Sequence, residues 1–332
     1  MVIKLEQWKS ISKVCESLGI EYPIIQGGMA LLSNPELVAG VSNAGGLGTL
    51  RPLSVGEVSA ATRLQQEVTE VRSLTDKPFA VNISLLAFKE SEANEVIDAA
   101  IDAKVPAVTI SGGNPFHYVS RLKDAGIKVL QVVFSVRHAK SAEKAGVDMV
   151  IVSGFEGGGH LSFDELPTLV LVPQVADAVN IPVIAAGGIC DARGLVAALA
   201  LGAEGIQMGT RFAATKECMA HPAFKEAIIK AIDTETVVTG RKSGPVRCLK
   251  NELATELLEM ENSGASADEI DAFVTGKYEQ AVVDGNIKKG SAMCGAIAGM
   301  ITEVISAAEV IRQMVSEYET VVARLQQQTK QT

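Results

Sequence analysis

Two glycine-rich stretches in the middle of the sequence have the residue types that bind a phosphate group. The first, AAGGI, contains Gly187 and Gly188, and the second, QMGT, contains Gly209 and Thr210. Glycine permits positive φ angles and a close approach to backbone amides, which can then hydrogen-bond an anion. One GG pair often only turns a corner. Two such stretches, with a threonine hydroxyl beside them, favour a phosphate site.

A third stretch, SGFEGGGH at 153–160, ends in a histidine that could transfer a proton. Its three consecutive glycines, Gly157, Gly158 and Gly159, are conformationally costly to order. The loop is therefore expected to leave backbone room for a large planar or anionic group. His160 follows these glycines, and an imidazole can donate a proton near neutral pH. His160 is the candidate catalytic residue.

Two more strand ends carry residues that could contact a ring system. Gly28 and Met29 lie in QGGMA, where glycine would admit a ring against the backbone and methionine could pad one face of it. Asn82 is a polar residue among Val, Ile and Leu in FAVNIS, so it could hydrogen-bond the heteroatoms of a ligand or a loop backbone.

These stretches follow short apolar, often β-branched runs that alternate with helical segments from Tyr22 to about Phe212. The runs are YPIIQ, GLGTL, FAVNIS, AVTIS, KVLQVVF, MVIVS, IPVIAA and GIQMG. Eight βα units predict a closed parallel sheet, a (β/α)₈ TIM barrel. In such barrels the reactive face is formed by the C-terminal ends of the strands, which is where the glycine-rich loops fall.

The pattern divides the chain into three segments. Residues 1–21 are predicted to form an amphipathic helix that packs on the barrel, and residues 22–212 plus 291–325 the barrel itself. Residues 213–290 read as an inserted helical cap before the last outer helix. That helix is expected in ITEVISAAEVIRQMVSEYETVVARL, with one face formed by Val304, Ala308, Ile311, Val315, Tyr318 and Val322.

A doubly wound open sheet is the main alternative to the barrel, because eight alternating units could also open out. The GxGxxG fingerprint of dinucleotide-binding sheets is missing after the first strand, however. AGGLGTL follows the first helix instead, where it is expected to let the second strand enter the barrel closely.

Composition excludes several classes of protein. The net charge of −9 arises from 30 basic and 39 acidic residues without a long basic block, so nucleic acid and anionic membranes are not expected partners. The five cysteines form no CxxC pair or metal-ligand cluster, which is typical of free thiols in a reducing cytoplasm. No apolar run approaches the ~20 residues of a spanning helix.

Taken together, these motifs resemble the FMN-dependent barrel enzymes that include nitronate monooxygenases and type II enoyl-[acyl-carrier-protein] reductases. The resemblance covers nearly the whole chain and rests on YPIIQGGMA, TDKPFAVNI, EGGGH, IPVIAAGGI with QMGTRF, and ECMAHPAFKE. One position departs from the family pattern. Ser153 stands seven residues before His160, where monooxygenases commonly have Gln and reductases Glu, so a contact on the flavin side is in doubt.

The resemblance implies FMN as the cofactor and assigns residues to it. Gly28 and Met29 would surround the flavin, Asn82 and Gln207 would make polar contacts, and Gly158 with Gly159 a backbone contact. Residues around the phosphate would be Gly187, Gly188, Met208, Gly209 and Thr210, and His160 would be the active-site histidine. In the C-terminal part, AVVDGNIKKGSAMCGAIAG resembles the reductase segment that brings Ser291 and Met293 towards the flavin.

Several reactions stay open within this resemblance. The preferred one is NADH- or NADPH-dependent reduction of an enoyl thioester, which implies acyl carrier protein as a partner and a homodimer as the assembly. The alternatives are oxidation of alkyl nitronates by O₂ and an NADH:quinone reductase. Outside flavoenzymes, a purine-nucleotide dehydrogenase-like barrel would need a cysteine in the sixth loop, and SGFEGGGH has none. A sugar-phosphate isomerase and a non-catalytic barrel are further alternatives.

Overall fold

The chain folds as a parallel barrel, which confirms the predicted fold class. The computed structural model describes Trp8 and residues 12–329. Eight strands lie in the order β1-β9-β8-β6-β5-β4-β3-β2, and a parallel bridge from Ile25 to Leu47 joins the two ends of the sheet. The strands are β1 (Ile24–Gln26), β2 (Gly48–Leu50), β3 (Phe79–Ser84), β4 (Ala107–Ser111), β5 (Lys128–Val133), β6 (Met149–Ser153), β8 (Val183–Ala186) and β9 (Gly205–Met208).

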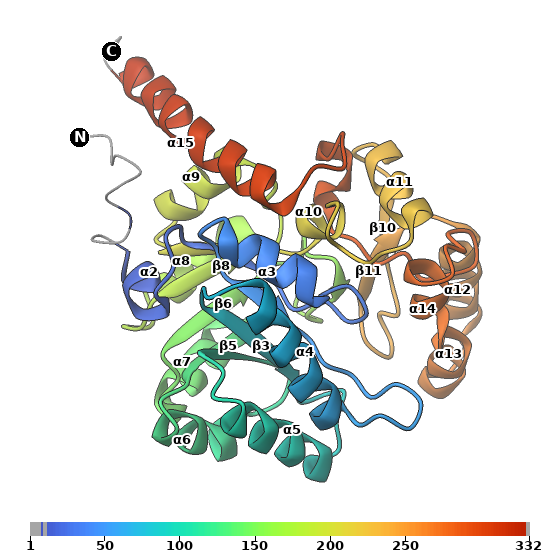
Figure 1. Cartoon of the computed structure of the whole chain (residues 1–332). Coiled ribbons are helices and arrows are strands. Elements are labelled where there is room, and N and C mark those ends of the chain that lie inside the picture. Colours follow the sequence, from blue (N-terminus) through green and yellow to red (C-terminus); the bar gives the residue numbers. More distant parts are fainter. Residues whose placement is uncertain (1–7, 9–11, 330–332) are drawn as a thin grey trace.

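Helices form an outer ring around the strands (Figure 1). They are α3 (Pro35–Asn43), α4 (Ala60–Leu74), α5 (Glu90–Asp102), α6 (Phe116–Asp124), α7 (Val136–Ala145), α8 (Thr168–Ala176), α9 (Ala192–Ala200) and α15 (Ala307–Thr329). The last of these, α15, packs between α9 and α3 and completes the ring. Within the described part of the chain, no helix has the length and apolar character needed to cross a membrane.

The last outer helix begins later than the sequence predicted. It starts at Ala307, because Ile305 pairs with Thr215 in a parallel bridge and residues before it are extended or irregular. Val304 therefore lies outside the helix, and Ala308 is exposed. Ile311, Val315 and Tyr318 are buried as predicted.

Apolar side chains fill both the barrel interior and the layer between strands and helices. The interior cluster includes Ile25, Leu130 and Ile184, and the short helix α2 (Lys13–Leu18) adds Val14 and Leu18 to it. Ser12, the N-cap of α2, donates a hydrogen bond to the carbonyl of Glu204, which precedes β9, so α2 sits at the N-terminal end of the barrel. Residues 1–7 and 9–11 of the predicted 1–21 helix lie outside the described residues.

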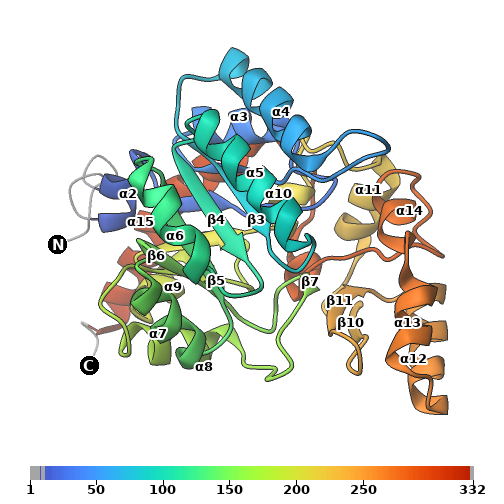
Figure 2. The same ribbon diagram turned by 90° about the horizontal axis from the view of Figure 1, so that it is seen from below.

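The segment predicted as a helical cap contains helices and also two strands. Its helices are α11 (Pro222–Lys230), α12 (Glu252–Ser263), α13 (Ala267–Val274) and α14 (Lys277–Val282), and the short α10 (Thr210–Ala213) ends where the segment begins. Between them β10 (Thr236–Thr239) and β11 (Val246–Leu249) form an antiparallel hairpin, so the prediction of helices alone is wrong here. The hairpin stands beside the barrel and pairs with the short strand β7 (Gly159–His160) (Figure 2).

Candidate functional site

The predicted phosphate loop follows β8 and is shaped by two glycines with positive φ, Gly187 at 92° and Gly188 at 74°. A Cβ on Gly187 would lie 2.9 Å from the carbonyl oxygen of Gly154 and 3.1 Å from Oγ1 of Thr168. Thr168 also donates a hydrogen bond to the Gly187 carbonyl at 3.0 Å. Gly154 and Thr168 thus pack tightly against the loop at Gly187, and only glycine fits at this position.

Donor groups of this loop are free to bind an anion. The backbone N–H groups of Gly188 and Ile189 donate no hydrogen bond to the described part of the chain. The hydroxyl of Thr210 accepts a hydrogen bond from the Gly295 amide at 2.8 Å and keeps its own proton. The neighbouring carboxylate of Glu156 accepts a hydrogen bond from the amide of Thr168. These residues fit a phosphate group.

The glycine loop after β6 approaches a segment from the far end of the chain. A Cβ on Gly158 would lie 2.5 Å from the backbone of Cys294 and Gly295, so this glycine allows the two backbones to touch. Gly159 has a φ of 73°, and its Cβ position lies 3.6 Å from Sδ of Met293. The structure therefore brings Met293 to the loop that ends in His160.

His160 lies in β7 and pairs with Val246 of β11. Its side chain retains an exposed surface, yet surrounding protein atoms desolvate the imidazole. This desolvation, together with the positive charge of Arg51, lowers the pKa of His160 below 6.5. The imidazole is therefore neutral at pH 7, and its N–H group remains a hydrogen-bond donor.

We expect this lowered pKa to make the folded protein sensitive to mild acid. The unfolded chain binds a proton near pH 6.5, whereas folded His160 resists it, so stability falls as pH drops from about 6.5 through the folded pKa. The variant His160→Gln should lose less thermal stability between about pH 7.5 and about pH 5 than the parent protein. Equal losses in melting temperature would contradict this assignment.

Arg247 on β11 holds the same loop. Its guanidinium donates to the Phe155 carbonyl from Nε at 3.3 Å and Nη2 at 3.1 Å, and lies 5.1 Å from the centre of the Phe155 ring. Nη1 donates to Thr236 Oγ1 at 3.2 Å. The hairpin is thus fastened to the loop that carries His160.

We expect Arg247→Met to destabilise the protein by about 1–3 kcal/mol, because the Phe155 carbonyl loses its charged donor. Urea denaturation would measure this change. The control is Arg312→Met, which removes an exposed pair with Glu309 on α15 and should change stability by less than about 1 kcal/mol. Equal effects of the two substitutions would show that Arg247 does not anchor the loop.

The remaining predicted residues fall into two groups. Gly28, Asn82 and Gln207 lie at the strand ends: the Cβ position of Gly28 is 2.4 Å from the Asn82 Cβ, and Gln207 packs on Gly27 at 3.2 Å. Met29 reaches the phosphate loops, 3.7 Å from the Cβ position of Gly209. Met208 is 2 % exposed and packs in the layer between strands and helices, so its side chain does not join the others.

Asn82 already has protein partners. Its amide donates to the carbonyl and Oγ1 of Thr109 at 3.2 and 2.9 Å, and its Oδ1 accepts from Ser111. A polar contact between Asn82 and a cofactor would therefore add to the hydrogen bonds that Asn82 already makes inside the barrel.

Sequence reasoning missed Arg51, which directly follows β2 at the reactive end of the barrel. Its Nε is buried and has no hydrogen-bond partner in the described part of the chain. The Arg51 charge acts on both His160 and Tyr278, and Tyr278 donates its hydroxyl to the Ala30 carbonyl at 2.8 Å. A charged residue immediately after GLGTL was the available signal.

Comparisons with known proteins give a consistent result. The profile of the family described as nitronate monooxygenase matches residues 12–111 and 89–317. A probable nitronate monooxygenase of Staphylococcus saprophyticus is 40% identical over 297 residues, which is 76% of this chain and 82% of the relative. FabK from Thermotoga maritima superposes with a TM-score of 0.88 and 43% identity, covering 95% of this chain and 98% of that structure.

A third similar protein acts on a coenzyme A thioester by its name. It is the (3aS,4S,5R,7aS)-5-hydroxy-7a-methyl-1-oxo-octahydro-1H-indene-4-carboxyl-CoA dehydrogenase of Rhodococcus jostii, 38% identical over 283 residues. The match covers 83% of this chain and 78% of that relative.

Proposed function

The chain belongs to the nitronate monooxygenase family and is an FMN-dependent oxidoreductase; within that family we propose that it reduces the 2,3-double bond of an enoyl thioester with electrons from NADH or NADPH. The observation that carries this proposal is the likeness to FabK, a type II enoyl-acyl-carrier-protein reductase, over nearly the full length of both chains. The thioester in the name of the Rhodococcus relative supports the same substrate class.

The position of Met293 supports the proposal independently. Residues 281–299 were identified in the sequence as reductase-like, and Met293, Cys294 and Gly295 of this segment pack on Gly158 and Gly159 beside His160. The amide of Ala296 also donates to the Glu156 carbonyl at 2.9 Å. The reductase-like segment thus lies at the candidate site.

In the proposed reaction, each group has a definite task. The chemistry that FMN supplies when bound is the transfer of hydride from the nicotinamide to the β-carbon of the thioester. Gly188, Ile189 and Thr210 would hold the phosphate through their N–H and O–H groups. His160 would donate a hydrogen bond or a proton near the thioester carbonyl, where negative charge develops. We further propose coenzyme A or acyl carrier protein as the thioester carrier, and a homodimer.

Oxidation of alkyl nitronates is the second candidate. It is favoured by the family profile and by the Staphylococcus relative. A nitronate is an anion, and Arg51, whose charge lowers the pKa of His160, offers it a positive charge. An NADH:quinone reductase is a third possibility that shares the cofactor.

An anaerobic absorbance titration separates these candidates. The yellow protein is first titrated with NADH and then mixed with crotonyl-CoA or propyl-2-nitronate. Bleaching by NADH followed by reoxidation with crotonyl-CoA is the expected result. Bleaching by the nitronate with no response to NADH would replace the proposal by nitronate oxidation. Reoxidation by a quinone but by neither other compound would indicate the quinone reductase.

A further inference from the structure

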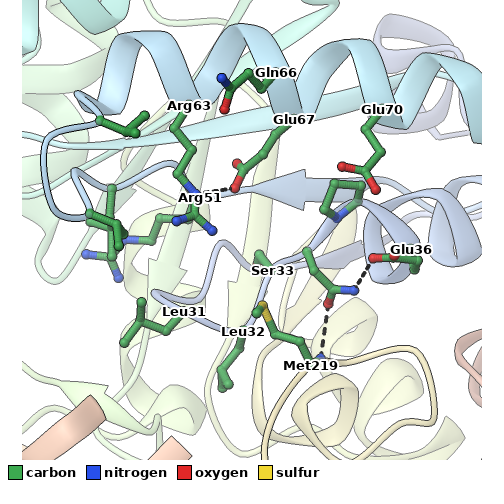
Figure 3. A pocket seen from close by; sticks show the side chains of 15 residues that line it. Leu31, Leu32, Ser33, Glu36, Arg51, Arg63, Gln66, Glu67, Glu70 and Met219 are labelled. Carbon is green, nitrogen blue, oxygen red and sulfur yellow. Dashed lines mark hydrogen bonds and ion pairs between the residues drawn. The ribbon is translucent and has the colours of Figure 1, made fainter. Parts of the chain in front are cut away.

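A pocket of about 420 Å³ opens beside the candidate site, between the loop after β1, the loop after β2 and helix α4. We call it the α4 pocket. Figure 3 shows Arg63, Gln66, Glu67 and Glu70 of α4 along one wall, with Leu31 to Ser33 and Met219 along the opposite wall. Its apolar lining consists of Leu31, Leu32, Leu53, Val55, Val58 and Met219.

Three exposed apolar side chains line the α4 pocket, among polar and charged ones. Val55, Val58 and Met219 are 46, 40 and 53% exposed, and all three line this one pocket. Val55 and Val58 are held by a small turn in which each amide donates to the carbonyl of the other, at 3.0 and 3.1 Å. Exposed apolar side chains that converge on one cavity are typical of a ligand-binding groove.

Charges in the pocket leave one cation without a partner. Arg63 pairs with Glu67 at 2.7 Å, which neutralises both. Glu36 and Glu70 are exposed on the rim, where solvent screens their charges. Two buried atoms of charged lining residues then have no partner among the described residues, Oε2 of Glu67 and Nε of Arg51, and burial lowers the pKa of Arg51. Arg51 is the cation among them, and a partly buried guanidinium whose Nε has no acceptor is costly unless a ligand supplies one.

Arg51 also connects the pocket with the predicted catalytic residue. It lines the α4 pocket, and its charge reaches His160. The loop that holds Gly28 and Met29 continues into Leu31, Leu32 and Ser33, which form a wall of the pocket. The α4 pocket therefore shares a wall with the loop that carries the predicted cofactor contacts Gly28 and Met29.

We propose that the α4 pocket holds the hydrocarbon chain of the substrate and that Arg51 donates hydrogen bonds to the substrate oxygen that becomes negatively charged. This inference rests on the proposed function for the identity of that oxygen, the thioester carbonyl. The outer end offers a polyphosphate no cationic partner, because the rim charges, Glu36 and Glu70, are both acidic. The occupant is an uncharged acyl chain of moderate length.

The electron balance explains why a cation is needed there. Hydride that originates from the reduced nicotinamide forms a C–H bond at the β-carbon. The electron pair of the 2,3-double bond then moves towards the carbonyl oxygen, where Arg51 binds the resulting negative charge. A proton added at the α-carbon completes the saturated thioester, and the nicotinamide leaves oxidised.

The first test replaces Arg51 in the FMN-loaded protein. We expect Arg51→Met to lower kcat/KM for trans-2-octenoyl-CoA by roughly tenfold to hundredfold, the usual effect of losing a charge-assisted hydrogen bond. The anaerobic reduction of the flavin by NADH should not change, and Arg51→Lys should recover part of the activity. Arg72→Met is the matched control, since Arg72 lies on α4 outside the pocket and donates to Ala103 and Lys104.

The second test fills the pocket. Val58→Trp should lower kcat/KM for trans-2-octenoyl-CoA by about tenfold and leave crotonyl-CoA nearly unchanged, because only the longer chain reaches Val58. Binding of octanoyl-CoA, measured by calorimetry, should weaken in parallel. Val170→Trp is the control, as Val170 is similarly exposed, at 45%, on α8.

The outcomes separate this inference from the proposed function. If Arg51→Met leaves thioester reduction intact, or Val58→Trp affects both chain lengths equally, the inference is wrong although the reductase stands. If the parent protein reduces no enoyl thioester, the proposed function fails, and the variants are assayed with ethyl and octyl nitronates. If nitronate oxidation depends on Arg51 and on chain length in the same way, the pocket assignment stands. If it depends on neither, the pocket assignment is wrong.

Discussion

Replacing His160 by Gln is expected to lower kcat for enoyl-thioester reduction by about 10²–10⁴-fold, the range typical of losing a general acid or its hydrogen bond. His160 is positioned by β7 and β11 at the reactive end of the barrel, next to Met293 and the predicted flavin loops. Glutamine keeps an N–H donor but does not place it where the imidazole N–H would meet the developing negative charge. Stopped-flow mixing of the reduced protein with crotonyl-CoA would measure this step directly.

Two comparisons make the His160 experiment decisive. The rate of flavin reduction by NADH should stay within about threefold of the parent rate, because the thioester takes no part in that step. His117→Gln is the matched control, since His117 is exposed at the start of α6. If His160→Gln slows reduction and reoxidation alike, the residue acts on the structure of the site and not on the thioester.

The barrel could be predicted from the sequence because its eight strands are short apolar runs, regularly spaced between helices. Each of the eight predicted runs contains an observed strand. The sequence predicted less well which strand side chains point into the barrel and which point towards the helices. Parallel strands that are covered on both faces show no clear alternation of polar and apolar residues. Met208 was assigned to the phosphate surroundings because it lies in QMGT, whereas its side chain packs in the layer between strands and helices.

Two other features depend on contacts that no local pattern encodes. TVVT and VRCL are four-residue runs between helices, and they become strands because β11 pairs with the distant β7. Arg51 gave only a weak signal, since a single arginine after a strand is usually a surface residue. Its role emerges from a buried Nε without a partner and from its proximity to His160.

Gly187→Ala is expected to yield protein that loses FMN, with an affinity reduced by roughly a hundredfold to ten-thousandfold. That range corresponds to the loss of about two charge-assisted hydrogen bonds to the phosphate. A methyl group at this position would meet the Gly154 carbonyl at 2.9 Å, and a φ of 92° is strained for alanine. The loop must then shift and move the free Gly188 and Ile189 amides away from the phosphate. Fluorescence titration of the apoprotein with FMN would give the affinity.

The matched control for this experiment is Gly126→Ala. Gly126 has a φ of 78°, yet a Cβ there would meet nothing within 4 Å, so alanine adds backbone strain without a clash. Gly126→Ala should therefore cost stability but leave the FMN affinity unchanged. If both variants keep FMN, the phosphate does not bind at the β8 loop. If both lose it equally, the loss reflects general destabilisation, because Gly126 lies after α6 and before β5, at the N-terminal end of the strands. Only selective loss in Gly187→Ala assigns the phosphate to this loop.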